Sequence, residues 1–165
     1  MRRTAILAVI VLSGIGLAAA ARQQAPAGQA GQAGGRGPQG PNVAEIQKVR
    51  DNLYVLTGGG GNTAAVVRAD GVTLIDTKLA NWGPAIMEKL RTVTDKPVTM
   101  IINTHTHGDH TGSNEFFDAR VEIVTHENTR ANMEKMEALK GKANAMPDPS
   151  FKDKLTLGRG TEQID

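Results

Sequence analysis

The run IINTHTHGDHTG, residues 101–112, holds three of the chain's four histidines and one aspartate within six consecutive positions. Such clustering is rare in an ordinary sequence, at roughly one in ten thousand, and a solvated polar loop is the plain alternative to a functional site. The run begins at the end of a β-rich apolar segment, 98–102, which predicts a buried strand. That strand would deliver the polar side chains directly to one edge of a sheet.

Local geometry gives the cluster a chemical meaning. On an extended backbone His105 and His107 project to the same side, because side chains alternate along a strand. Gly108 allows the chain to turn, which brings Asp109 and His110 round to a neighbouring point. Neutral imidazoles and a carboxylate form a ligand set suited to Zn²⁺. Two such pairs side by side predict two metal ions, about 3.5–4 Å apart.

Short strands separated by turns precede this run. We expect strands at 53–57, 63–68 and 72–76, the last two joined by a hairpin at Asp70-Gly71. Further along, we expect a helix opened by Asn81, with Pro84 in its first turn, then a strand at 121–125, a helix at 127–140 and a loop-like tail. Antiparallel strands followed by strand, helix, strand, helix predict an α/β (α+β) fold, with helices packed against a mixed sheet.

Glycines 58–61 separate the first two predicted strands. The run superficially indicates phosphate binding, but neither a helix nor a P-loop lysine follows it in the required order. A flexible hairpin loop near the metal site is the interpretation that we carry forward.

The residues quoted above carry a family resemblance. The run 101–112 resembles the central motif of the metallo-β-lactamase superfamily, and VTLIDT, residues 72–77, resembles that family's strand ending in aspartate. The resemblance extends from about Leu53 to Leu139. It implies the metallo-β-lactamase αβ/βα sandwich, of which this chain would hold only the N-terminal αβ half.

The resemblance also implies a ligand set. His105 and His107 would bind one zinc ion, and Asp109 and His110 would bind the other, giving two Zn²⁺ per complete domain. Asp76 resembles a residue that orients a ligand by hydrogen bonding, with an aspartate that merely completes a turn as the alternative.

The resemblance further implies a zinc-dependent hydrolase acting on a small molecule. A metal-bound hydroxide would attack an amide, lactam, ester or thioester carbonyl, and Asp109 would also help to orient this nucleophile. Two other groups of relatives fit less well. Diiron flavoproteins usually carry glutamate where His107 stands. The predicted export and the neutral charge of the mature chain, both described below, argue against the nucleases. A mononuclear iron oxygenase remains an alternative.

One departure from the family matters. Relatives draw a histidine, a bridging carboxylate and a last histidine from the second half of the fold. After His110 this chain has only His126, which we expect to begin a helix rather than bind metal. The alternative function is therefore a half-domain that has no activity of its own and binds metal weakly or needs a partner chain.

The N-terminal region indicates export. Residues 1–21 combine a basic start, an apolar run and a small-residue exit, which predicts a cleaved signal peptide. Residues 22–42 are rich in Gly, Gln, Ala and Pro and predict a disordered linker to a domain at 43–165. We therefore expect a periplasmic or secreted protein, with an uncleaved signal segment as its only route to membrane contact.

Composition excludes several other classes. The chain of 165 residues contains no cysteine, so it has neither disulfides nor thiolate metal ligands. Its net charge of +2 includes Arg2 and Arg3, and removing them leaves 17 basic against 17 acidic residues. With no dense Lys/Arg stripe, the sequence gives no case for nucleic-acid binding.

Overall fold

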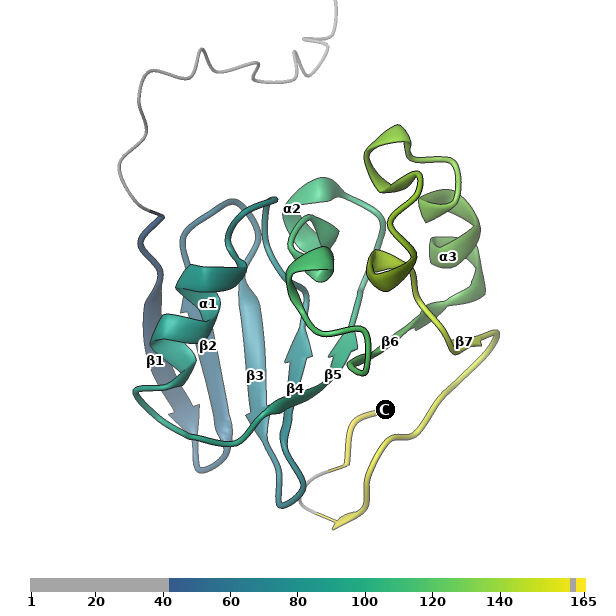
Figure 1. Ribbon diagram of the computed structural model, residues 1–165. Coiled ribbons are helices and arrows are strands. Elements are labelled where there is room, and N and C mark those ends of the chain that lie inside the picture. Colours follow the sequence, from purple (N-terminus) through teal and green to yellow (C-terminus); the bar gives the residue numbers. More distant parts are fainter. Residues whose placement is uncertain (1–41, 161–162) are drawn as a thin grey trace, which may run out of the picture. The chain divides into compact units, whose positions relative to one another are not determined.

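A seven-stranded mixed sheet forms the centre of the molecule in the computed structural model, which describes residues 42–160 and 163–165. The predicted signal peptide and nearly all of the predicted linker, residues 1–41, lie outside the described residues. The strands lie side by side in chain order (Figure 1). They are β1 (Glu45–Arg50), β2 (Leu53–Thr57), β3 (Thr63–Val67), β4 (Val72–Ile75), β5 (Val98–Ile102), β6 (Glu122–His126) and β7 (Ser150–Phe151).

The pairing changes direction in the middle of the sheet. Strands β1 to β4 pair antiparallel, whereas β4 to β7 pair parallel. The antiparallel part includes the predicted hairpin, in which the Arg68 N–H donates to the Gly71 carbonyl at 2.8 Å. The predicted α/β class with a mixed sheet is confirmed, while β1 was missed because its exposed sequence lacks an apolar face.

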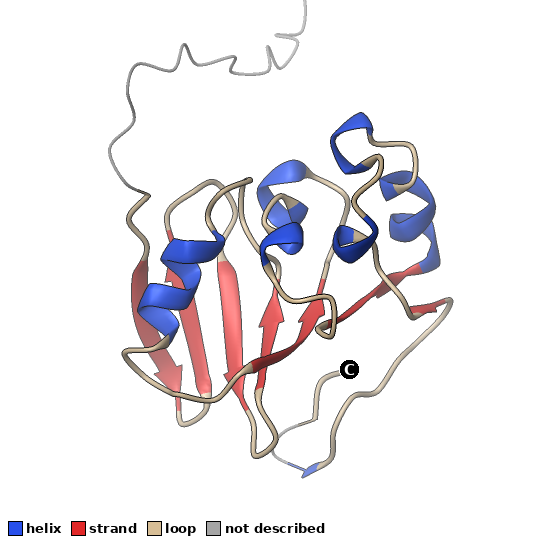
Figure 2. Cartoon of the chain, in the orientation of Figure 1, coloured by secondary structure: helices blue, strands red, loops and turns tan. Residues whose placement is uncertain are grey.

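Helices connect the parallel strands (Figure 2). They are α1 (Gly83–Leu90), α2 (Gly108–Thr111) and α3 (Glu127–Met133), with 3₁₀ turns η1 (Asn114–Phe116), η2 (Glu137–Leu139) and η3 (Ala143–Ala145). Within the described ranges, no helix has the length and apolar character needed to cross a membrane.

Two predicted helix boundaries were wrong. Asn81 does not open α1, because its φ of 68° takes it out of the helix, and the first free N–H groups of α1 donate instead to Ser113 Oγ. The helix predicted at 127–140 ends at Met133, where the hydrogen bonds tighten to i→i+3. This tightening allows Met133 and Leu139 to share one small buried cluster.

The main core lies between α1 and one face of the sheet. Ile86 and Leu90 of α1 are fully buried and pack in one cluster with Leu74 of β4 and Ile101 of β5. These two strands therefore have fixed positions relative to each other, and the loops at their carboxyl ends start from a rigid base.

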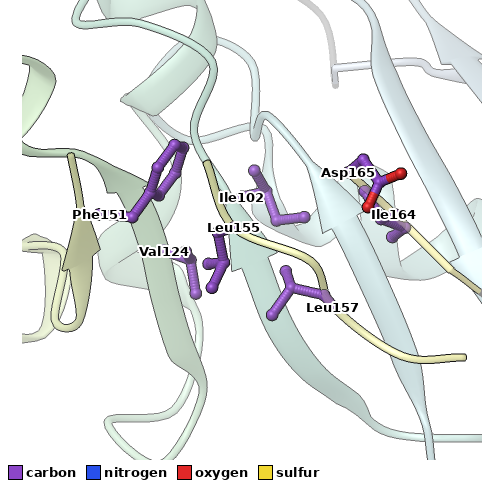
Figure 3. Close-up of a pocket in the computed structure, with 7 residues that line it drawn as sticks. All are labelled: Ile102, Val124, Phe151, Leu155, Leu157, Ile164 and Asp165. Atoms are coloured by element: carbon purple, nitrogen blue, oxygen red, sulfur yellow. The ribbon is translucent and has the colours of Figure 1, made fainter. Parts of the chain in front are cut away.

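The opposite face carries a row of aligned apolar residues. Strand pairing places Val55, Ala64, Ile75, Ile102 and Val124 directly beside one another across β2 to β6. Part of this row is covered by the C-terminal segment, whose Leu155, Leu157 and Ile164 enclose a cavity of about 80 Å³ with Ile102 and Val124 (Figure 3).

The two edges of the sheet differ in character. Strand β1 forms one edge, with five of its six residues exposed and an irregular register between Lys48 and Arg50. Strand β7 forms the other edge and is only two residues long.

Candidate metal centre

The candidate site lies where two parallel strands end side by side. Asp76 follows β4, and the histidine run begins at His105, three residues after the end of β5, so parallel pairing brings both to the same edge of the sheet. The Asp76 N–H donates to the carbonyl of Ile102 at 2.9 Å, which ties the two strand ends together. The predicted strand before the motif is confirmed, but of its five residues only Ile101 is fully buried.

The Asp76 carboxylate is the anchor of the site. It is 4% exposed, and both of its oxygens accept hydrogen bonds from the motif segment. Oδ1 accepts from the Thr104 N–H at 2.8 Å, and Oδ2 accepts from the Thr104 hydroxyl at 2.7 Å. Oδ2 also lies 2.7 Å from His110 Nδ1. A single buried carboxylate thus holds the backbone and two side chains in place.

This network sets the tautomers of two imidazoles. Because ionised Asp76 can only accept, His110 carries its proton on Nδ1 and leaves Nε2 free. The Thr104 hydroxyl uses its one hydrogen on Asp76, so its oxygen accepts from His105 Nδ1, 2.9 Å away. His105 therefore also has a free Nε2. Fixing one ring nitrogen by a hydrogen bond is how proteins prepare the other to bind metal.

The predicted ligands lie together. The His105 ring centroid is 4.7 Å from that of His107 and 4.1 Å from that of His110. Asp109 Oδ2 lies 3.5 Å from His110 Nε2. All four side chains are exposed or half-buried, in contrast to Asp76. The motif residues therefore gather at one accessible point above the sheet edge.

The donor set fits a divalent metal ion. Asp76, His105 and His110 each offer one ligand atom within 4.8 Å of the others. Geometry alone would allow Asp76 to be a ligand, but both of its oxygens already accept hydrogen bonds from Thr104 and His110. These hydrogen bonds favour the orienting role expected for Asp76, which stays a prediction, with the free imidazole nitrogens as the expected donors.

The glycine loop forms one wall of the site. A Cβ added at Gly60 would lie 2.7 Å from Asp109 Cβ, and one at Gly61 would lie 2.7 Å from both the Asp109 carbonyl and His110 Cε1. No side chain fits between this backbone and the motif. The loop between β2 and β3 is therefore beside the metal centre, as the sequence predicted, in direct contact with two of the proposed ligands.

Lys78 lies beneath this loop and is fully buried. Its Nζ donates to the carbonyls of Leu56 and Gly61, both at 2.8 Å. Burial away from water lowers the pKa of the ammonium from 10.5 to about 8. The residue was not identified from the sequence, because a lone lysine after a strand gives no sign that it is buried.

Other supporting residues were also missed. Asn103 and Asn114 are buried and hydrogen-bonded to each other, with Asn114 Nδ2 donating to Asn103 Oδ1 at 2.7 Å. The Thr77 hydroxyl donates to Asn114 Oδ1 at 2.7 Å, which links the β4 end to the turn after α2. Their signal in the sequence was only proximity to the motif.

His126 is the histidine that we expected to begin a helix. It is the N-cap of α3, where its Nδ1 accepts from the Asn128 N–H at 3.1 Å. Its Nε2 donates to the Lys152 carbonyl at 2.5 Å. Both ring nitrogens are thus engaged away from the site.

An apolar cavity of about 200 Å³ lies beside α2. Gly108 and Thr111 of α2 form one side, and Leu79, Met136 and Leu139 lie around it. Gly108 directly precedes Asp109, so the cavity adjoins the motif along the chain.

Comparison with known proteins identifies the family. The model of the metallo-beta-lactamase superfamily matches residues 56–164, about two thirds of the chain. The chain belongs to the metallo-beta-lactamase superfamily. Members of this superfamily are hydrolases and commonly bind metal. No curated protein matches the sequence significantly.

Solved structures of this superfamily share the fold. A metallo-beta-lactamase from Pontibacter korlensis has a TM-score of 0.60 at 22% identity, over 73% of this chain and 58% of its own. A Cronobacter sakazakii metallo-beta-lactamase with a HARLDQ motif has a TM-score of 0.58 at 17% identity, over 73% and 51%. FIM-1 from Pseudomonas aeruginosa, in its mono-zinc form, has 0.52 at 15%, over 68% and 51%. The chain thus spans little more than half the length of these structures.

The role of Asp76 leads to a first prediction. In Asp76→Asn the amide must present its NH₂ group either to the Thr104 N–H or to His110 Nδ1, so one donor faces another. We expect zinc affinity to fall about 10- to 100-fold. Competition with a chromophoric chelator measures the affinity, and ¹⁵N NMR of the His110 ring reports its tautomer. Asp118→Asn, on the surface, is the matched control, and equal affinities for the two variants would contradict the orienting role.

Lys78 leads to a prediction about pH. The folded state loses this proton near pH 8, whereas the unfolded chain keeps it until about pH 10.5. The unfolded state therefore binds more protons in this window, and stability contributed by Lys78 rises with pH. We expect the melting temperature of the unchanged chain, relative to Lys78→Met, to increase between pH 8 and 10.5. Parallel melting curves over that range would contradict a lowered pKa.

Proposed function

We propose that this chain carries the metal-binding residues of a zinc-dependent hydrolase that acts on a small molecule outside the cytoplasm. The substrate class is an amide or lactam, an ester or a thioester. The observation that carries the proposal is the arrangement around Asp76, which leaves a free Nε2 on both His105 and His110. Imidazoles prepared in this way are what a Zn²⁺ site requires.

Two pairs of side chains would hold two ions. His105 and His107 would bind one ion, and Asp109 and His110 the other. Zinc bound there would lower the pKa of a water ligand to about 7 and would polarise a carbonyl oxygen. Asp109, whose side chain is 40% exposed, would orient the nucleophile as well as bind metal.

The second candidate function is a half-domain that binds metal weakly and needs a partner chain for activity. It is favoured by one observation, the ligand count within the described residues: four proposed side chains shared between two ions leave each ion with few protein ligands. A third possibility, a mononuclear iron oxygenase, differs from both candidates because the bound metal would be iron and not zinc.

Metal content tests the proposal. We expect the purified chain to retain about two zinc ions, and His107→Ala and Asp109→Ala each to retain about one fewer, since each loses one ligand. Mass spectrometry of the metals gives the count and identity, and turnover is measured with chromogenic lactam, ester and thioester substrates. Asp118→Ala serves as the control.

The possible outcomes are distinct. Zinc with turnover supports the hydrolase, and weakly held zinc without turnover supports the half-domain. Iron supports the oxygenase. Zinc content and turnover that are unchanged in both variants would overturn the proposed site.

Export is the remaining part of the proposal, and it rests on the sequence of residues 1–21. We expect the mature protein from a bacterial host to begin near residue 21 or 22 and to lie in the periplasm or medium. N-terminal sequencing and cell fractionation measure this. A full-length cytoplasmic product would contradict it.

A further inference from the structure

Lys78 is the one large cation in the described part of the chain that is completely buried, and the proposed chemistry does not use it. Its ammonium bonds to the carbonyl of Leu56, near the end of β2, and to that of Gly61, at the far end of the glycine loop. One side chain therefore grips the loop at both of its ends.

The same residue also contacts α2 through its backbone. The Lys78 carbonyl accepts from the Gly112 N–H at 2.9 Å, and the neighbouring Leu79 N–H donates to the Gly59 carbonyl at 3.3 Å. Lys78 has a φ of 64°, a left-handed conformation that lysine rarely adopts. An unfavourable backbone conformation is retained only where the surrounding contacts hold it in place.

The loop that Lys78 holds lies against particular ligands. Gly60 and Gly61 pack on Asp109 and His110 so closely that neither glycine has room for a Cβ. These two motif residues form the second of the two proposed ligand pairs. If the loop moved away, its backbone would no longer restrict the side-chain orientations of Asp109 and His110.

We propose that Lys78 is a positioning residue that clamps residues 58–61 onto Asp109 and His110 and thereby sets the affinity of the second metal ion. This inference rests on the proposed function. In this inference the buried ammonium of Lys78 acts on the metal ligands only through the β2–β3 loop. The lysine itself contacts neither metal nor substrate.

The test compares two destabilising variants that differ in location. Lys78→Met keeps the apolar stem and removes the ammonium, whereas Leu90→Ala opens the core at the end of α1. Hydrogen exchange of residues 57–63 measures how firmly the loop is held. Stepwise zinc titration, well below both melting temperatures, measures each metal affinity separately.

We expect Lys78→Met to raise exchange in the loop and to weaken the second zinc about 10-fold, with the first zinc nearly unchanged. Leu90→Ala should do neither. Gly61→Ala, which leaves Lys78 intact but inserts a Cβ against His110, should reproduce the loss at the second ion.

The outcomes separate this inference from the proposed function. If the unchanged chain binds no zinc, the proposed function fails for this chain, and the exchange measurement alone decides whether Lys78 clamps the loop. If zinc binds but Lys78→Met matches the unchanged chain in loop exchange or in its second affinity, the inference is overturned while the proposed function stands. Equal effects of Lys78→Met and Leu90→Ala on loop exchange and zinc affinity would mean that Lys78 contributes only to overall stability. That result would also overturn the inference.

Discussion

The site depends on one buried carboxylate between the ends of two parallel strands. Asp76 follows β4, yet all of the hydrogen bonds of its carboxylate go to the segment that leaves β5. A buried carboxylate without partners is costly, so the network and the strand ends stabilise each other. The same bonds that satisfy Asp76 also fix the tautomers of His105 and His110. Folding and preparation of the metal ligands are thus one physical event at this edge of the sheet.

Sequence predicted those parts of the molecule that follow from local rules. A run of β-rich apolar residues located β5, Asp70-Gly71 located a hairpin, and the motif indicated the candidate ligands. Long-range contacts decided the rest. Nothing near Asn81 reveals that Ser113, far along the chain, takes over the start of α1. Lys78 was missed for the same reason, because its hydrogen-bond partners are Leu56 of β2, 22 residues earlier, and Gly61 of the loop, 17 residues earlier.

The glycine run illustrates how one pattern can have several causes. Four consecutive glycines are compatible with phosphate binding, with flexibility and with close backbone approach. In the structure the third applies, because the backbone at Gly60 and Gly61 touches Asp109 and His110. A Cβ at Gly60 or Gly61 would collide with the motif, whereas one at Gly59 would collide with the ring of Trp82 and one at Gly58 would crowd the same ring. The loop backbone is in turn hydrogen-bonded by the buried ammonium of Lys78, so in the proposed inference Lys78 determines how firmly the loop lies against the motif.

The margins of the sheet have a consequence for self-association. Unpaired strand edges act as templates onto which other chains add strands, and long flat edges are the most dangerous. Here one margin carries Glu45, Lys48 and Arg50 on an irregular strand, and the other stops after two residues. Both ends therefore oppose fibre-like growth.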